Sequence, residues 1–271
     1  MAAIDEPLVV LTRPEGRNVS LARRLRGAGF QVLELPALVV RPLPFDPTDL
    51  PLPQECDLIV FVSAYAASLY LSRLAEVGWA GPWPDSTLAA TVGEASARPL
   101  REAGFIPDDR IIHPAADASQ DSEALWALLR RRGASLRRVV LVRGESGREW
   151  LGARLQEQGA HVRRYAVYQR QPAQWGDDQR QALLAGMGSA REPIVLLTSS
   201  ESVDAFLRNL RETAPSGGME RLKYVVIHER IATRLQSGLG ALRDDMLERR
   251  VRICKPDDDD ILRAVASFAS L

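Results

Sequence analysis

Five short segments of the 271-residue chain carry residue types that could bind anions, and each follows a short apolar run. They are Thr12-Arg13-Pro14, Ser63-Ala64, Gly93-Glu94, Arg143-Gly144-Glu145 and Thr198-Ser199-Ser200. The first N–H groups of a helix lack partners inside the helix and carry a partial positive charge, so a helix starting at such a segment could bind a carboxylate. Arg13 and Arg143 could add their guanidinium groups. We therefore predict carboxylate binding at these turns, while helix capping by Ser and Thr is the alternative interpretation.

The hydrophobic pattern indicates the elements that would position these turns. Short β-branched runs alternate with segments of helical period, which predicts parallel sheets covered by helices on both faces. The predicted strands are residues 8–12, 32–35, 58–62, 87–91, 139–142, 194–198, 224–227 and 251–254. Because ligands of open parallel sheets bind at the carboxyl ends of the strands, we expect all five turns at that edge.

The chain contains two copies of one α/β pattern. The segment that begins at Leu11 aligns with the segment that begins at Leu141, and Arg13 then corresponds to Arg143 (143 − 13 = 130). A second similarity relates residues 63–71 to 199–207. Self-similarity of this kind predicts two related lobes.

The order of the copies predicts a discontinuous first lobe. We expect residues 1–36 plus 173–271 to form one lobe and residues 45–167 the other, each with a flavodoxin-like or Rossmann-like parallel sheet. Residues 37–44 and 168–172 would then be interdomain linker strands, paired as a two-stranded β linker, because both are extended stretches that contain X-Pro steps. Ordinary loops are the alternative there. The substrate is expected in the cleft between the lobes.

Bulk composition excludes some classes of protein. Lys plus Arg number 35 and Asp plus Glu number 35, so the positive excess expected of a nucleic-acid-binding protein is missing. No G-x-G-x-x-G or G-x-x-x-x-G-K-[ST] motif follows a predicted strand, which argues against a nucleotide-binding protein. The most apolar stretch, residues 58–71, is too short to span a bilayer. With Asp5 and Glu6 ahead of the first apolar run, the sequence predicts a cytoplasmic protein with no membrane partner.

Metal chemistry is not indicated either. Cys56 and Cys254 lie far apart without a ligand at metal-binding spacing, so we predict neither a zinc site nor a disulfide. His113 and His161 lack partners that would make them general bases. The acidic run 257–260 precedes an apolar helical segment and is interpreted as a helix N-terminus.

A series of motifs, in one order along nearly the whole chain, resembles the uroporphyrinogen-III synthase family. The series is LTRPEGRNVSLARRLRGAGFQVLELPAL, DLIVFVSAYAASLYL, ATVGEASARPLREAGF, DSEALWALL, VVLVRGESGREWLGARLQEQGAHVRRYAVYQR and PIVLLTSSESVDAFL. Each motif alone is common in α/β folds, so the resemblance depends on their order and coverage.

The resemblance implies two lobes joined by a two-stranded linker, with no metal and no organic cofactor. It also implies a reaction. The linear tetrapyrrole hydroxymethylbilane would lose its hydroxyl as water, its D ring would be inverted, and the macrocycle would close to uroporphyrinogen III. Such a substrate carries several carboxylates and an already activated leaving group, so the protein must bind anions, donate a proton and control shape.

The resemblance also assigns single residues. Tyr168 matches a tyrosine of the family and is the candidate acid, because a phenol is protonated at neutral pH; a strand tyrosine packed between lobes is the alternative. Ser96 matches a hydroxyl of the family that could contact a propionate or the leaving group, with capping as its alternative. The chain departs from the family pattern at His228 and Ile231, so no site residue is assigned at that turn.

An enzyme and a binding module both fit the scaffold. A non-catalytic two-lobed ligand sensor would keep the repeated α/β units but could lose Tyr168, Ser63, Ser96 or the turn at Thr198. All four are present, which favours a hydro-lyase. The expected partners are hydroxymethylbilane and, transiently, the upstream deaminase, and the protein is expected to be a monomer.

Overall fold

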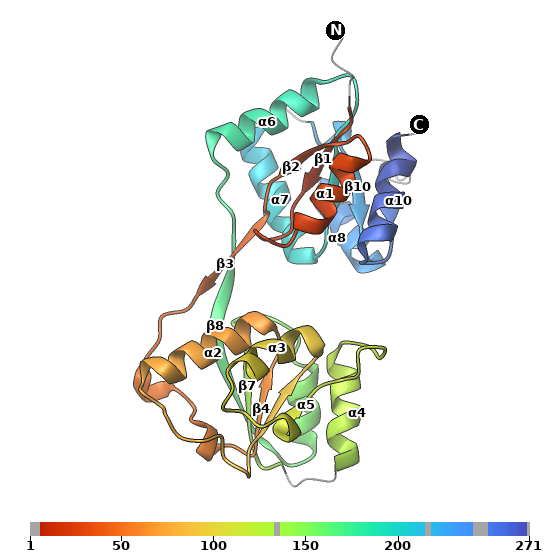
Figure 1. The fold of residues 1–271 in the computed structure, drawn as a ribbon. Coiled ribbons are helices and arrows are strands. Elements are labelled where there is room, and N and C mark those ends of the chain that lie inside the picture. The colour runs from red at the N-terminus through yellow and green to blue at the C-terminus, as the bar shows by residue number, and fades with distance from the viewer. Residues whose placement is uncertain (1–5, 133–135, 215–217, 241–248, 270–271) are drawn as a thin grey trace. The chain divides into compact units, whose positions relative to one another are not determined.

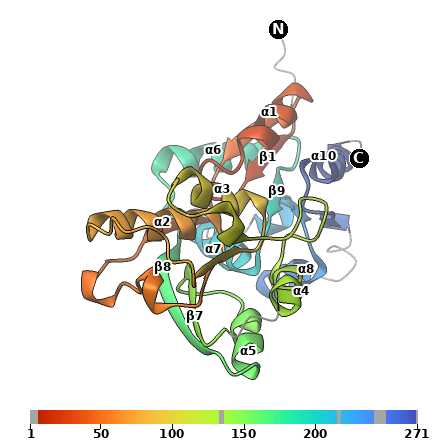
Figure 2. The same ribbon diagram turned by 60° about the horizontal axis from the view of Figure 1, so that its bottom comes forward.

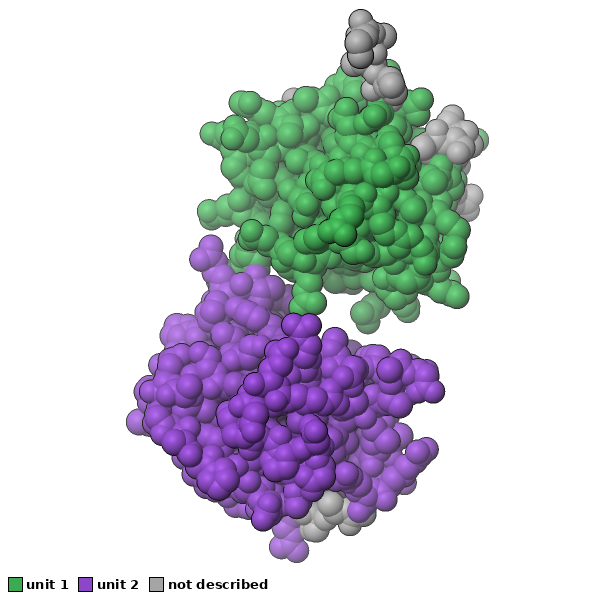
Figure 3. All heavy atoms as spheres, in the orientation of Figure 1, with its two compact units in different colours: residues 1–39, 171–271 green, residues 40–170 purple. Residues whose placement is uncertain are grey.

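The computed structural model describes residues 6–132, 136–214, 218–240 and 249–269. The chain divides into two compact units: unit 1 comprises Met1–Val39 and Gln171–Leu271, and unit 2 comprises Val40–Arg170 (Figure 3). The first unit is built from both ends of the chain, which confirms the discontinuous first lobe of the predicted fold class. The predicted domain limits stay a proposal about which parts of the chain fold on their own.

Unit 1 contains a five-stranded parallel sheet in the order β11-β10-β9-β1-β2 (Figure 1). Its strands are β1 (Leu8–Leu11), β2 (Gln31–Glu34), β9 (Ile194–Leu197), β10 (Lys223–Val226) and β11 (Val251–Ile253). Apart from the half-buried Leu8 and Lys223 at their starts, the three central strands are buried runs of Val, Leu, Ile and Tyr, as expected for a sheet covered on both faces.

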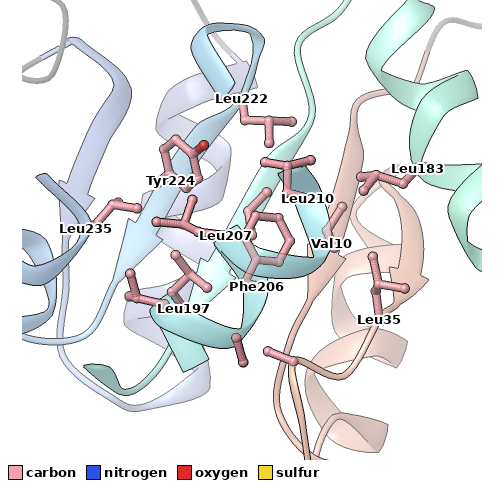
Figure 4. Close-up of a cluster of buried hydrophobic side chains, with 14 of the residues drawn as sticks. Val10, Leu35, Leu183, Leu197, Phe206, Leu207, Leu210, Leu222, Tyr224 and Leu235 are labelled. Carbon is pink, nitrogen blue, oxygen red and sulfur yellow. The ribbon is translucent and has the colours of Figure 1, made fainter. Parts of the chain in front are cut away.

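Helices cover both faces of this sheet. They are α1 (Val19–Gly27), α6 (Asp177–Gly188), α7 (Ser200–Thr213), α8 (Glu229–Leu239) and α10 (Asp258–Ala269). The apolar residues of α1 and α10 pack on one face. Those of α6, α7 and α8 pack on the other, where Phe206 and Leu207 of α7 lie against Tyr224 and Leu197 of the sheet (Figure 4).

Unit 2 contains a second sheet in the order β3-β8-β7-β4-β5-β6. Its strands are β3 (Leu38–Pro42), β4 (Leu58–Phe61), β5 (Leu88–Thr91), β6 (Ile111–Ile112), β7 (Arg138–Gly144) and β8 (His161–Pro172). The pairs from β8 to β6 are parallel. Sequence reasoning did not place a strand at β6, because two residues are too few to show a period.

Helices α2 (Ala64–Glu76) and α3 (Glu94–Glu102) pack on one face of this sheet, and α4 (Ser122–Arg132) and α5 (Trp150–Glu157) pack on the other. Figure 2 shows each pair side by side. The repeat is visible in α2 and α7, because Tyr70 and Phe206, which correspond in sequence, are both fully buried under their own sheets. None of the helices in the described ranges has an apolar stretch long enough to span a bilayer.

The chain passes from one unit to the other along β3 and returns along β8, and these two strands are neighbours in the sheet. Leu43 N–H donates to the Val167 carbonyl at 3.0 Å, and Ala173 N–H donates to the Ala37 carbonyl at 2.9 Å. The predicted two-stranded linker is therefore present. Its second strand begins earlier than expected, at His161, because neither Gly nor Pro interrupts the sequence before Pro172.

Candidate functional site

The N-terminus of α2 in unit 2 offers free backbone donors. Ser63 follows β4 with an extended backbone, and its Oγ accepts the N–H of Ala66 at 3.1 Å. This hydroxyl therefore caps the helix. The N–H groups of Ala64 and Tyr65 donate to no acceptor in the described chain, and both residues are half-buried. They are therefore available to an acceptor such as a carboxylate oxygen, and carboxylate binding at this turn stays a prediction.

A β-bulge places Tyr168 at the same end of unit 2. Along the β7–β8 pair, Arg143 lies opposite Ala166 and Gly144 lies opposite Tyr168, so Val167 is an extra residue in β8. A bulge re-aims the side chain that follows it. As a result both Val167 and Tyr168 are buried, although neighbouring residues of a regular strand point to opposite faces.

The ring of Tyr168 is held on several sides, but its hydroxyl is free. The ring centre lies 5.4 Å from that of Tyr65 in the first turn of α2, and the Arg170 guanidinium carbon lies 5.8 Å from it. Tyr168 is 5% exposed. Its hydroxyl has no hydrogen bond within the described chain and is not one of the buried unpartnered atoms, so it is open to solvent. A phenol in this position can donate to a bound molecule.

The N-terminus of α3 is closed by a side chain. Gly93 is the N-cap, and the Gln120 carboxamide oxygen accepts the N–H of Glu94 at 2.9 Å. A methyl group on Gly93 would lie 2.2 Å from that oxygen, so glycine is required for this contact. Ser96 is half-buried in the first turn of the helix, and its hydroxyl has no partner in the described chain. A carboxylate bound here would replace the Gln120 oxygen.

The segment Arg143-Gly144-Glu145 is not a helix N-terminus, contrary to expectation. Arg143 and Gly144 end β7, and α5 begins only at Trp150. Arg143 is 5% exposed, and its guanidinium donates to the Gly144 carbonyl at 3.1 Å and pairs with Glu149. Arg143 is therefore a buried cation paired with an exposed carboxylate, and Gly144 lies against the ring of Tyr168.

In unit 1, the turn Thr198-Ser199-Ser200 begins α7. The Ser199 Oγ accepts the N–H of Ser202, and the Ser202 Oγ accepts the N–H of Ser199, each at 3.0 Å. Ser199 is therefore a helix cap. The hydroxyls of Thr198 and Ser200 are half-buried and have no partner in the described chain, so these two residues can serve a ligand.

Thr12 and Arg13 also follow a strand without starting a helix, because α1 begins at Val19. Thr12 is 1% exposed, and its hydroxyl donates to the Leu196 carbonyl of the adjacent strand at 2.5 Å. Arg13 pairs with Asp258 at 3.2 Å. Thr12 thus joins β1 to β9, and Arg13 contacts the acidic run that begins α10.

His228 occupies the turn where the chain departs from the family pattern. Its Nδ1 accepts the N–H of Arg230 at 3.1 Å, which caps α8. The proton of the neutral ring is then on Nε2, which is a hydrogen-bond donor. Ile231 is 1% exposed in the core and offers no polar group.

The structure thus brings together the start of α2, Gly144 and Tyr168 in unit 2. Sequence reasoning missed Tyr65 and Gln120, since only three-dimensional proximity identifies them. The described chain contains no group of three or more His, Cys, Asp or Glu side chains that could hold a metal ion. The chemistry available at these residues is hydrogen bonding to anions and proton donation by a phenol.

Two α/β units, the first of them discontinuous, with hydrogen-bond donors at the strand ends define a class of α/β protein suited to polyanionic ligands. Comparison with known families is more specific. The family model described as uroporphyrinogen-III synthase HemD matches residues 19–242. Since this match covers most of the chain, the chain belongs to the uroporphyrinogen-III synthase family, which confirms the resemblance seen in the sequence.

Individual relatives agree. The uroporphyrinogen-III synthase of Synechococcus elongatus is 30% identical over 216 residues, which cover 74% of this chain and 75% of the relative. That of Escherichia coli (strain K12) is 25% identical over 228 residues, with coverages of 83% and 88%.

Two solved structures share the fold. The uroporphyrinogen-III synthetase from Helicobacter pylori 26695 has a TM-score of 0.57 at 20% identity and covers 97% of this chain and 99% of its own. A mutant uroporphyrinogen III synthase from the extremely thermophilic bacterium Thermus thermophilus has the same TM-score at 17% identity and the same coverages.

Proposed function

We propose that this protein is a uroporphyrinogen-III synthase, a lyase of tetrapyrrole biosynthesis. It converts hydroxymethylbilane into uroporphyrinogen III and one molecule of water, with inversion of ring D. The proposal follows from membership of the family and from a site made of anion-binding donors and a phenol.

The observation that carries the catalytic assignment is the free hydroxyl of Tyr168 beside the start of α2. The ring is fixed against Tyr65 and Gly144, whereas the hydroxyl has no competing acceptor in the described chain. It can therefore donate to the hydroxyl of the bilane as that group leaves as water. Its proton requires replacement, which the ring proton lost on closure of the macrocycle can supply.

The remaining residues bind the carboxylates of the substrate. The free N–H groups of Ala64 and Tyr65 serve this role in unit 2, and the hydroxyls of Thr198 and Ser200 serve it in unit 1. At Gly93 and Ser96 a substrate carboxylate has to displace Gln120. Arg13, Arg143, Thr12, Ser63 and Ser199 support these turns through the contacts described above. No cofactor is required, and a cytoplasmic monomer that receives its substrate from the upstream deaminase stays part of the proposal.

The test couples the upstream deaminase to this protein and resolves the uroporphyrinogen isomers that form. Spontaneous closure leaves ring D uninverted, so an excess of isomer III over the control without this protein supports the proposal. Exclusive formation of the uninverted isomer, with the bilane bound, would instead identify a non-catalytic binding module.

A further inference from the structure

Arg73, in the last turn of α2, is a buried cation without an acidic partner. Its side chain is 4% exposed. No carboxylate in the described chain lies within ion-pair distance of it. A buried charge is unfavourable unless its hydrogen-bonding groups are satisfied, so the contacts of this guanidinium explain why it is there.

Within the described residues, the guanidinium of Arg73 contacts dipoles and aromatic faces. Nη1 donates to the Tyr165 hydroxyl at 3.1 Å, and Nη2 donates to the carbonyls of Leu43 at 2.7 Å and Val167 at 3.3 Å. Its guanidinium carbon lies 5.2 Å from the ring centre of Phe45 and 5.4 Å from that of Tyr165. Such ring faces stabilise a desolvated cation.

Two of these contacts are to backbone carbonyls of the crossing segments, at Leu43 just after β3 and at Val167 in β8. Val167 is the extra residue of the bulge in β8, and residues of a bulge are left out of the regular ladder. Here the Val167 carbonyl accepts from both Leu43 N–H and Arg73. Arg73 therefore fixes the bulge to α2, immediately before Tyr168.

Side chains of α2 consequently hold β8 at two points, and Figure 1 shows the helix beside this strand. Near the start of α2, Tyr65 packs against the ring of Tyr168. In the last turn of α2, Arg73 donates to the carbonyl of Val167, the residue before Tyr168. The start of α2 is also where free backbone donors are available. Any shift of the bulge would change the distance between the phenol and those donors.

We propose that Arg73 is a positioning residue, which holds the bulge at Val167 and thereby sets the place of the Tyr168 hydroxyl relative to the N-terminus of α2. This inference rests on the proposed function, because it concerns the same phenol. Arg73 would contact no substrate and would act only through the position of Tyr168.

Two substitutions test the proposal. Arg73→Met keeps an unbranched apolar stem like that of arginine and removes all three donated hydrogen bonds. Arg73→Lys keeps the charge but replaces the fork with a single ammonium group, which cannot make all of the same bonds. We expect kcat to fall about tenfold in Arg73→Met and less in Arg73→Lys, with KM within about twofold of the wild-type value.

The matched control is Tyr165→Phe. It removes one acceptor of Arg73 and leaves the bonds to Leu43 and Val167, so kcat should stay within about twofold of wild type. An equal loss in Tyr165→Phe and Arg73→Met would overturn the proposal, because the bulge would then not be the important contact.

A double-mutant cycle with Tyr168→Phe separates positioning from general support of the fold. If Arg73 acts through the phenol, Arg73→Met should lower kcat by less than about twofold in the Tyr168→Phe background. If the loss of kcat in the double mutant equals the product of the losses in the two single mutants, Arg73 acts independently of Tyr168 and the proposal is overturned.

Amide hydrogen exchange of the substrate-free protein provides a readout that does not depend on the reaction. Loss of Arg73 should accelerate exchange at Leu43 and Glu145, whose N–H groups donate to Val167 and Tyr168, and should leave Val195 of unit 1 unchanged. Unchanged exchange at Leu43 and Glu145 in both Arg73 variants contradicts the proposal. A wild-type protein that forms no isomer III would instead refute the proposed function, while this measurement still decides whether Arg73 holds the bulge.

Discussion

The ring of Tyr168 lies directly against the backbone of Gly144. A methyl group on Gly144 would lie 2.6 Å from Cε2 and 2.9 Å from Cζ of that ring, which is closer than carbon atoms approach without repulsion. Gly144 is therefore required by the position of Tyr168, and its own backbone has no need of a left-handed conformation.

We expect Gly144→Ala to displace the tyrosine ring. The variant should lose about 1–3 kcal/mol of stability through overpacking, and its turnover should fall because the phenol moves away from the start of α2. Thermal unfolding and the coupled isomer assay measure the two effects.

Gly27→Ala is the matched control for this substitution. Gly27 lies in α1, and no atom comes within 4 Å of the position of an added methyl group. Alanine is favoured over glycine inside a helix by about 1 kcal/mol, so this variant should be at least as stable as the wild type and fully active. Normal turnover in Gly144→Ala would show that the ring position is unimportant.

Tyr168→Phe tests the phenol itself. General acid catalysis typically contributes about 10²- to 10⁴-fold. Because the leaving group of the bilane is already activated, we expect kcat to fall by about 10²-fold or less. KM should change little. Because the hydroxyl has no partner in the described chain, the free energy of unfolding should change by less than about 0.5 kcal/mol. Undiminished kcat, or an unfolded variant, would contradict the assigned role.

The turn at the start of α7 allows capping and ligand binding to be separated. Ser199→Ala removes the cap of α7 and should lower stability by about 1 kcal/mol. Ser200→Ala removes a hydroxyl without a partner in the described chain. It should leave stability unchanged and raise KM up to about tenfold, the effect of losing one hydrogen bond to a carboxylate. Unfolding curves and steady-state kinetics on both variants measure the difference, and the reverse pattern would show that Ser200 has no role in binding.

The fold was predictable because it repeats. The matched segments beginning at Leu11 and Leu141 predict two α/β units, and the buried strands are continuous apolar runs that need no tertiary information. Three of the five predicted turns begin helices, since Ser63, Gly93 and Ser199 come immediately before helical residues. The turns at Thr12 and Arg143 are each followed by a longer loop before the next helix begins. The apolar pattern does not encode this difference in loop length.

The details of the candidate site were not predictable in the same way. The bulge at Val167 depends on the pairing of two strands, and no residue type in AVYQR indicates it. Gln120 and Arg73 each act through a contact to a distant part of the chain. Long-range hydrogen bonds of this kind have no local sequence signal, so an arginine on a helix is expected at the surface.

Glu149 should stabilise the protein only while its carboxyl group is ionised. The carboxylate of Glu149 accepts hydrogen bonds from Arg164 and Arg143, and chiefly the bond from Arg164 holds the pKa of Glu149 below its ordinary value. A carboxyl group with a lowered pKa in the folded state stabilises the protein above its unfolded pKa of about 4.3, and this contribution is lost as the pH falls toward the folded value. Glu149→Gln should therefore be less stable than the wild type near neutral pH, and the difference should shrink as the pH falls below about 4.3. Glu157→Gln is the control, because Glu157 is as exposed as Glu149 but pairs with the exposed Arg154 instead of the buried Arg143, and pairs between two exposed side chains contribute little. Thermal unfolding between about pH 7 and pH 3 measures the effect. If the difference in stability between wild type and Glu149→Gln stays constant over this range, the ionised carboxylate contributes nothing to the network around Arg143.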